Sequence, residues 1–226
     1  MLLIIPAFNE EANIARVVGS LERDYPHLDY VVVNDGSTDA TAAICAEHGF
    51  NILNLPVNLG LAGAFQAGMK YAWRRGYRYA VQFDGDGQHR AEFVGDMREK
   101  MDEGCDLVIA SRYVLQKKPF SLRMMGSRLI GGAIFLTTGV RIHDPTSGMR
   151  MFGRKLIGEF AFRLNYGPEP DTLAYLIRHG ARVAEVPAEM DERTAGASYL
   201  TPFRAMGYMA RILMSILVVQ AFRGKG

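Results

Sequence analysis

The sequence predicts an α/β fold in which helices cover both faces of a mostly parallel sheet. Short apolar runs alternate with longer helical segments through the first half of the 226 residues, as they do where helices join parallel strands. The composition agrees with this fold. Hydrophobic residues make up 49% of the chain and charged residues 22%, as in a globular protein with a full core.

The first half of the chain divides into strands and helices in turn. Strands are predicted at residues 2–5, 30–33, 51–55, 79–83 and 106–110, and helices at 9–24, 61–75, 91–103 and from the turn at 34–39 to residue 48. The first strand is expected to stop at Pro6, which has no N–H group for a neighbouring strand. The helix at 9–24 is expected to open with Glu10 and Glu11, where the helix dipole favours negative charge.

The second half is less regular. We predict helices within 119–138, at 170–179 and at 202–222, strands at 149–152 and 182–186, a turn at 144–148 and a polar loop at 191–198. Pro187 is expected to stop the last strand, and Pro202 is placed at a helix N-terminus, where its missing N–H costs no hydrogen bond. We expect one domain at 1–200 and a C-terminal apolar or amphipathic helix at 201–226.

Charge and cysteine content exclude several classes. A formal charge of +2 is too small to indicate nucleic-acid binding. The two cysteines, Cys45 and Cys105, indicate neither a disulfide framework nor a zinc site. The first five residues lack the basic start and the length of a signal peptide, so the cytoplasm is the expected compartment.

Two carboxylates follow the strand predicted at 79–83. Asp84 and Asp86 are one residue apart among glycines, so in an extended segment their side chains lean the same way. Oxygen ligands at a strand end suit Mg²⁺ or Mn²⁺, which often bridge to substrate phosphates. Taken alone, such a pair indicates a polar Asp-Gly turn more often than a metal site. His89, close behind it, is given no catalytic role.

Polar residues follow other strands too, and the ends of parallel strands are where α/β sheets bind ligands. Asn9, Glu10 and Asp35 would join the two aspartates in a nucleotide pocket with a metal at one end. The alternative for residues 35–37 is a turn and helix cap. Taken alone, Arg112, Arg123 and Arg128 are equally consistent with a solvated basic face on the protein surface.

Six motifs in order resemble the family 2 glycosyltransferases of GT-A (Rossmann-like) fold. They are Pro-Ala-Phe-Asn-Glu-Glu at 6–11, Val-Asn-Asp-Gly-Ser at 33–37, Asp-Gly-Asp-Gly-Gln-His at 84–89, Ser-Arg-Tyr at 111–113, Asp-Pro-Thr-Ser-Gly-Met-Arg at 144–150 and Glu-Val-Pro at 185–187. The last three are similar to the branch that includes dolichyl-phosphate mannose synthases and loads polyprenyl phosphates.

The resemblance implies roles for individual residues. Pro6, Phe8 and Glu10 line the base and ribose site, Asp35 hydrogen-bonds the base, and Val33 packs beside it. Asp84 and Asp86, with Gln88 as a further ligand, hold Mg²⁺ or Mn²⁺ on the diphosphate of the sugar nucleotide. Arg112 faces a phosphate, as do Arg123 or Arg128, and Arg193 belongs to a loop that closes over the site.

The chain departs from the mannose enzymes in two places. Those enzymes carry a Lys shortly after the Arg and Gly of the closing loop, where this chain has Tyr199. The segment 166–171 also differs. A uridine diphosphate sugar is therefore at least as consistent with the sequence as guanosine diphosphate mannose.

The resemblance implies an inverting transfer of one sugar to a polyprenyl (undecaprenyl or dolichyl) phosphate. Such an acceptor is already ionised at neutral pH and needs little help from a base. A hydroxyl acceptor needs a carboxylate base, for which Asp144, Glu169 and Asp171 are the candidates. Two alternatives stay open: a family 2 transferase that acts on a saccharide hydroxyl, and a non-catalytic nucleotide-binding subunit of a membrane complex.

The C-terminal helix is almost entirely apolar, with Arg204 and Arg211 near its start and Arg223 and Lys225 after its end. Its unbroken apolar stretch at 212–219 is too short to span a bilayer, which needs about 20 residues. We expect it to lie at the inner face of the cytoplasmic membrane as a peripheral anchor. The alternatives are packing on its own core and docking on a small membrane protein or a second copy of the chain.

Overall fold

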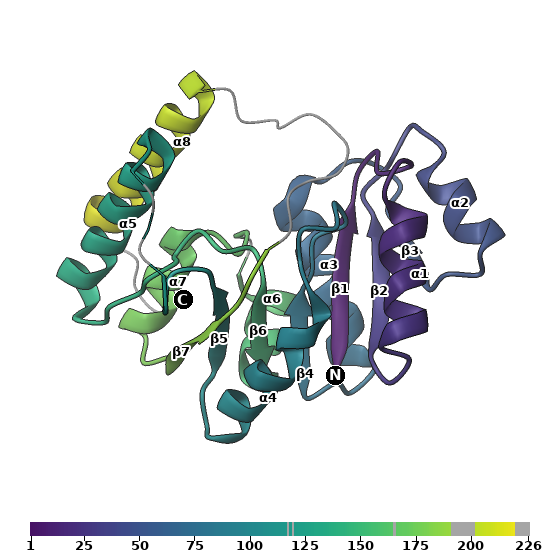
Figure 1. Ribbon diagram of the computed structural model, residues 1–226, viewed down its shortest axis with the longest axis horizontal. Helices are drawn as coiled ribbons and strands as arrows, with labels where there is room; N and C mark the ends of the chain where they lie inside the picture. The colour runs from purple at the N-terminus through teal and green to yellow at the C-terminus, as the bar shows by residue number, and fades with distance from the viewer. Residues whose placement is uncertain (117, 119, 165, 191–201, 220–226) are drawn as a thin grey trace.

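A seven-stranded sheet in the order β3-β2-β1-β4-β6-β5-β7 forms the centre of the computed structural model (Figure 1). The structure describes residues 1–116, 118, 120–164, 166–190 and 202–219. The strands are β1 Leu2–Ala7, β2 Asp29–Asn34, β3 Ile52–Asn54, β4 Tyr79–Gln82, β5 Leu107–Ser111, β6 Arg150–Gly153 and β7 Val183–Pro187. All pairings are parallel except those of β6, which runs antiparallel to β4 and β5. The predicted α/β class is confirmed.

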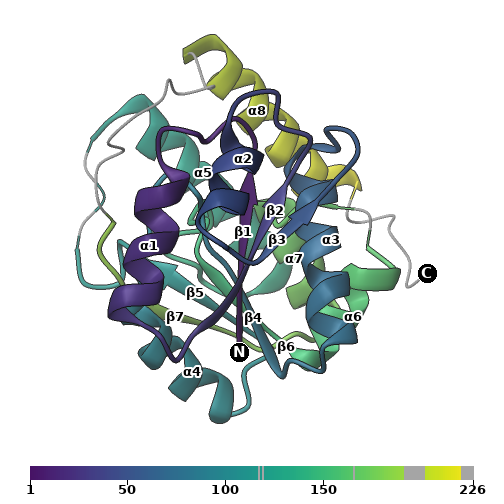
Figure 2. The same ribbon diagram turned by 90° about the vertical axis from the view of Figure 1, so that its right-hand side faces the viewer.

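Helices cover both faces of this sheet (Figure 2). They are α1 Ile14–Asp24, α2 Thr41–Glu47, α3 Gly60–Arg74, α4 Val94–Asp102, α5 Leu122–Thr138, α6 Arg154–Phe162, α7 Pro170–Arg178 and α8 Pro202–Met214, with a 3₁₀ turn at Ala91–Phe93 and a π turn, η2, at Ser215–Val219. Leu3 and Ile5 pack with α1 and α4, whereas Leu2 and Ile4 pack with α3 and α6. Side chains alternate along a strand, so an uninterrupted apolar run fills both cores.

Pro6 does not stop β1, which corrects the prediction. The strand continues to Ala7 and pairs Pro6 with Val33 of β2. The carbonyl of Ile4 accepts from the N–H of Phe83, so the main chain of Pro6, two residues on, faces the same side. The ladder between β1 and β4 ends at Ile4, and the missing N–H of Pro6 therefore costs no partner. Pro187, by contrast, is the last residue of its strand, β7, which lies at the edge of the sheet.

Helix α1 begins at Ile14 and not at Asn9. Asn9 has a positive φ of 56°, which a helix cannot accommodate, and residues 10–13 form a turn. The N–H groups of Glu10 and Glu11 donate to Thr41 Oγ1 and Asp39 Oδ2 in the loop after β2. These tertiary hydrogen bonds hold Glu10 and Glu11 in the turn and not in the first turn of a longer helix.

Helix α6 was not predicted from the sequence. It packs along α3, where a side chain at Gly158 would collide with the Trp73 ring. Arg154, its first residue, lies 3.8 Å above that ring and donates to the carbonyls of Trp73 and Tyr77. The C-terminal end of α3 thereby gains the positive charge that helix C-termini favour.

The C-terminal segment is helical in α8 and η2, where it packs on α5 and α7. Ile212 and Ile216 belong to the buried core, while Met214 and Leu217 are exposed. One side of this helix therefore packs on the protein core, and its other side is exposed and available for contact with lipid or a partner protein. The division at residue 200/201 stays a prediction, and the polar loop at 191–198 lies outside the described residues. No helix in the described part of the chain is long and apolar enough to cross a membrane.

The core on the α3 side predicts a stability difference between two phenylalanines. Phe65 is completely buried, with the rings of Phe152 and Phe160 at centroid distances of 5.3 and 5.2 Å. Phe65→Ala should lower the free energy of unfolding by about 3–5 kcal/mol. Phe120→Ala, at a side chain that is 92% exposed, should change it by less than about 0.5 kcal/mol. Urea unfolding followed by circular dichroism measures both, and equal losses would contradict this assignment of the core.

Candidate active site

The predicted site residues that follow strands of the described structure lie at one edge of the sheet. The carboxyl ends of β1, β2, β4 and β5 meet there because these strands are parallel. Strand β6 runs the other way, so its beginning reaches the same edge and carries the loop at 144–149 into it. A groove of about 640 Å³ lies elsewhere on the protein, beside Asp29 and Tyr77, and none of the predicted site residues lines it.

The loops after β1 and β2 are hydrogen-bonded to each other. The main-chain N–H of Asn9 donates to Ser37 Oγ at 3.0 Å, and Asn9 Oδ1 accepts from the N–H of Thr38 at 2.9 Å. These bonds place Pro6, Phe8 and Glu10, all half-buried, beside the loop that begins at Asp35. One face of the predicted nucleotide pocket is therefore assembled from two strand ends.

Asp35 is buried, and its Oδ1 accepts from the N–H of Leu59 at 2.7 Å, just before α3. Gly36 follows with a φ of 67°, and a Cβ there would lie 2.7 Å from the main-chain nitrogen of Asn58. Only glycine allows this approach. Val33 is completely buried in the core between the sheet and α3. The base-binding roles of Asp35 and Val33 stay predictions.

The two aspartates after β4 adjoin this pocket. Asp84 is half-buried, Asp86 is buried, and Asp86 Oδ1 accepts from the N–H of Gln88 at 3.1 Å. A Cβ at Gly85 would lie 3.3 Å from the Pro6 carbonyl and 3.8 Å from Glu10 Cγ. The Asp-Gly-Asp loop therefore rests against the predicted nucleotide residues.

The donor set fits a hard divalent cation in part. The described residues contain no group of three or more His, Cys, Asp or Glu side chains that could hold a metal by themselves. Two carboxylates and the Gln88 amide offer oxygen ligands, which suits Mg²⁺ or Mn²⁺ when substrate phosphates and water complete the shell. The metal assignment of these three residues stays a prediction.

His89, which the sequence left without a role, contacts Asp84 twice. The N–H of Asp84 donates to His89 Nδ1 at 2.9 Å, so Nδ1 is unprotonated and the hydrogen is on Nε2. Nε2 then faces Asp84 Oδ2 at 3.4 Å, and the buried ring packs edge-on against Phe83. One imidazole thus orients both the main chain and the carboxylate of Asp84. No pattern in the sequence separates such a histidine from an exposed loop residue.

Gly148 brings the loop at 144–149 against the same aspartate. A Cβ at this position would lie 2.8 Å from Asp84 Oδ2 and 3.3 Å from the His89 ring. Glycine is therefore needed for close contact between this loop and the predicted metal ligand.

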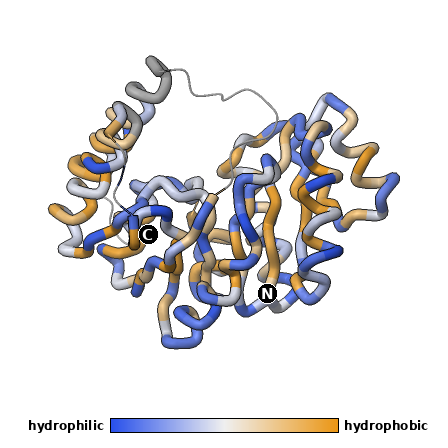
Figure 3. Tube along the Cα trace, viewed as in Figure 1, coloured by the Kyte–Doolittle hydropathy of each residue, from blue (hydrophilic) through white to orange (hydrophobic). Residues whose placement is uncertain are grey.

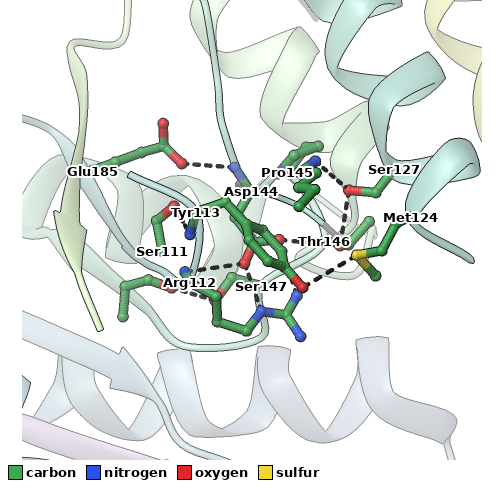
Figure 4. A network of polar contacts seen from close by, with 12 residues as sticks. Ser111, Arg112, Tyr113, Met124, Ser127, Asp144, Pro145, Thr146, Ser147 and Glu185 are labelled. Carbon is green, nitrogen blue, oxygen red and sulfur yellow. Dashed lines mark hydrogen bonds and ion pairs between the residues drawn. The ribbon is translucent and has the colours of Figure 1, made fainter. Parts of the chain in front are cut away.

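On its other side, the same loop forms an ion pair with Arg112, which follows β5 (Figure 4). Asp144 is completely buried, and Arg112 donates to it through Nε at 2.7 Å and a terminal nitrogen at 2.9 Å. Burial disfavours the charge of Arg112, but the bonds to Asp144 outweigh it and raise the pKa of the guanidinium. Glu185 of β7 accepts from the N–H groups of His143 and Asp144. Arg112 also lines a cleft of about 320 Å³.

Arg150 fixes the loop from below. Its guanidinium is buried and donates to the carbonyls of Pro145 and Ser147 at 2.7 and 3.0 Å, and at 3.4 Å to that of Glu169. Burial lowers the pKa of this arginine. The other two candidate bases are linked to the C-terminal segment, since Tyr208 donates to Glu169 and Ser215 donates to Asp171 at 2.6 Å.

The remaining arginines are described to different extents. Arg128 is exposed on α5 and donates to the carbonyl of Lys118 at 2.7 Å. The side chain of Arg123 and the whole of Arg193 lie outside the described residues. Their contacts with phosphate stay predictions.

The sheet order, the antiparallel β6 and the double-aspartate loop define a glycosyltransferase of GT-A architecture. Residues 2–160 match the model of glycosyl transferase family 2. The chain therefore belongs to this family.

Two curated relatives match most of the chain. It is 31% identical over 214 residues to polyprenol monophosphomannose synthase of Mycolicibacterium smegmatis, with 88% of this chain and 80% of the relative covered. It is 30% identical over 216 residues to undecaprenyl-phosphate mannosyltransferase of Micrococcus luteus, with 89% and 87% covered.

Among solved structures, glucosyl-3-phosphoglycerate synthase from Mycobacterium tuberculosis, in complex with Mn²⁺, uridine diphosphate and phosphoglyceric acid, superposes with a TM-score of 0.71. The comparison covers 100% of this chain and 79% of that one at 22% identity. The likeness at this identity is one of fold.

The contacts of His89 predict an effect on metal binding. His89→Ala should weaken Mn²⁺ binding in the presence of uridine or guanosine diphosphate by about 10–100-fold, because Asp84 loses the group that orients it. Electron paramagnetic resonance of free Mn²⁺ measures this without turnover. His89→Asn, whose amide oxygen can replace Nδ1, should recover part of the affinity. His48→Ala, at an exposed position just after α2, serves as the control, and an unchanged affinity in His89→Ala would refute the role.

Proposed function

We propose that this protein transfers one sugar, with inversion, from a nucleoside diphosphate sugar to a polyprenyl phosphate at the inner face of the cytoplasmic membrane. The family and the activities that give both relatives their names support the reaction class. The observation that carries the choice of acceptor is the state of the candidate bases. Asp144 is bound by Arg112, Glu169 by Tyr208, and Asp171 by Ser215.

A general base must have an oxygen within hydrogen-bond reach of the hydroxyl proton, and each of these carboxylates already accepts a hydrogen bond from another side chain. A phosphate monoester needs no such base, because it is ionised at neutral pH. Because all three candidate bases are hydrogen-bonded to other side chains, a phosphate acceptor is favoured over a saccharide. The second candidate function, transfer to a hydroxyl, would require one of these pairs to open.

On the donor side, Asp84 and Asp86, with Gln88, would hold the divalent cation, which when bound neutralises charge that develops on the leaving diphosphate. Pro6, Phe8, Glu10 and Asp35 would bind base and ribose next to them, because Gly85 lies against Pro6 and Glu10. These positions hold the donor still while the acceptor approaches, which lowers the barrier by orientation alone.

On the acceptor side, Arg112 and Arg128, with Arg123 and Arg193, would bind the phosphate. Arg112 is fixed by Asp144, so its guanidinium has one orientation and loses little freedom on binding. The loop at 144–149 separates this ion pair from Asp84, which Gly148 touches. Donor and acceptor phosphates would thus bind on the two sides of one loop, with the anomeric carbon between them.

The outer side of α5 supports a membrane location (Figure 3). Ile130 and Ile134 face the core, while Met125, Leu129 and Leu136 are exposed along the opposite stripe. A helix on a globular surface needs one apolar stripe, and α5 has two. Neither 122–138 nor 202–219 contains an acidic residue, and Arg128 and Arg211 are exposed. Apolar and cationic together, this surface suits anionic lipid headgroups.

The donor is best found by a thermal-shift panel of uridine and guanosine diphosphate sugars with Mn²⁺, because a ligand at ~100 times its dissociation constant stabilises by about 2.7 kcal/mol. Radiolabelled transfer from the sugar nucleotide thus selected to undecaprenyl phosphate then tests the reaction. Transfer to saccharides but not to the lipid would reject the proposal. Binding of the donor with no turnover on either acceptor would favour a non-catalytic subunit.

Asp86→Asn should reduce turnover by about 100-fold or more, because a ligand charge is lost where negative charge develops. The stability should change little, since asparagine keeps the Oδ1 that accepts from Gln88. Asp96→Asn, at an exposed position on α4, is the control for loss of one charge. Wild-type turnover in Asp86→Asn across a Mn²⁺ titration would show that the metal residues are assigned wrongly.

Leu129→Glu combined with Leu136→Glu should reduce sedimentation with liposomes that contain phosphatidylglycerol, because each change places a carboxylate where acyl chains are expected. Both side chains are exposed, so the melting temperature should stay within a few degrees of the wild type. Ala43→Glu combined with Ala46→Glu, at two exposed positions of α2 at the far end of the molecule, adds the same charge as a control. Equal sedimentation of all variants would mean that α5 does not meet lipid.

A further inference from the structure

Lys118 lies at the end of a chain of polar contacts that starts at the Arg112–Asp144 pair. Thr146 Oγ1 donates to Asp144 Oδ1 at 3.2 Å and lies 3.4 Å from Ser127 Oγ (Figure 4). The ammonium of Lys118 donates to that Ser127 oxygen at 2.7 Å. It also lies 5.4 Å from the centre of the Tyr113 ring, whose other cation is Arg112 at 5.2 Å. The segment before α5 thereby adds a second cation to the acceptor side.

The charges around Lys118 do not balance. Asp144 is taken by Arg112, and Glu185 accepts from His143 and from the main chain of Asp144. Within the described residues, Lys118 has no carboxylate within ion-pair distance, and its contacts are the neutral Ser127 and Tyr113.

Burial lowers the pKa of Lys118; the charges of Asp144 and Glu185 act against this, and those of Arg112 and Arg128 act with it. A half-buried ammonium beside two guanidinium groups is stabilised by an added anion, because an opposite charge nearby favours the charged form.

The surroundings of Lys118 also suit an apolar group attached to that anion. Leu115 and Phe120, three and two residues from Lys118, are 80% and 92% exposed. Met125, in the first turns of α5, is exposed as well and begins the outer stripe of that helix. Anion and apolar surface are therefore adjacent on one segment, as a phosphate monoester with a hydrocarbon chain requires.

We infer that Lys118 binds the phosphate of the acceptor, a phosphomonoester dianion, with Ser127 orienting its ammonium. This inference rests on the proposed function and adds a substrate-binding residue that the sequence did not single out. Lys118 contributes charge and a hydrogen bond to the phosphate, and makes no contact with the nucleotide sugar. Its loss acts on acceptor affinity and leaves donor affinity unchanged.

The test compares Lys118→Gln, which keeps a donor for Ser127 but has no charge, with Lys118→Arg, which keeps the charge. Binding of farnesyl phosphate and of glycerol 3-phosphate to the full chain is measured by titration calorimetry, and donor binding is measured with the sugar nucleotide selected above and Mn²⁺. Lys118→Gln should weaken farnesyl phosphate binding at least 10-fold and leave donor binding within 2-fold. Lys118→Arg should restore acceptor binding to within about 3-fold. Lys100→Gln, at a surface lysine that pairs with Glu103, should match the wild type.

The outcomes separate this inference from the proposed function. If Lys118→Gln binds farnesyl phosphate like the wild type, or if the wild type binds neither phosphomonoester, the role of Lys118 is overturned. If glycerol 3-phosphate binds and accepts sugar as well as the lipid, and Lys118→Gln weakens both, the residue keeps its role and the lipid acceptor is rejected. A Lys118→Gln that weakens donor and acceptor equally would indicate a structural role and also overturn the inference.

Discussion

A completely buried carboxylate, that of Asp144, organises the edge of the sheet where the site lies. Removing a charge from water costs several kcal/mol, and the structure offsets this cost with three hydrogen bonds from Arg112. Because Arg112 follows β5 and Asp144 precedes β6, the pair fixes the distance between two strand ends. Glu185 adds β7 through the main chain of residues 143 and 144. Removing one partner of a buried ion pair typically lowers the free energy of unfolding by about 3–5 kcal/mol. Both residues are therefore needed to keep this edge of the sheet in place.

The direction of β6 is the second constraint. A parallel strand in this place would have put the residues before it at the opposite edge, away from Asp84. The antiparallel strand delivers Gly148 to the aspartate and Asp144 to the arginine with one short loop. Arg150, the first residue of β6, then fills the space beneath that loop and satisfies its carbonyls. The residues predicted to contact the metal and the phosphate are thus placed by one turn of the backbone and not by two independent loops.

The sequence predicted those features that depend on local pattern. Buried parallel strands are continuous apolar runs, so β1, β2 and β4 were evident, and the position of the aspartates followed from the end of β4. Features that depend on contacts between distant residues could not be read in this way. The direction of β6 depends on its pairing partners, and helix α6 is recognisable only once α3 lies beside Gly158. The start of α1 was missed because Thr41, at the start of α2, and Asp39, just before it, accept from the N–H groups of Glu10 and Glu11. For the same reason, nothing local to Arg112 or His89 announced their partners.

The hydroxyl groups of Tyr208 and Ser215 connect the C-terminal segment to residues 39 and 44 positions earlier in the chain. Arg150 in turn touches the carbonyl of Glu169, so the loop at 144–149 rests on a helix that α8 holds in place. During synthesis α8 emerges after every strand of the sheet, while domains fold largely as the chain appears. Until then Glu169 and Asp171 lack two donors, and the apolar surface that receives Ile212 and Ile216 is open to water. A nascent chain that stalls before α8 would thus have a nearly complete sheet but would expose an apolar surface. Chaperones and proteases recognise such surfaces.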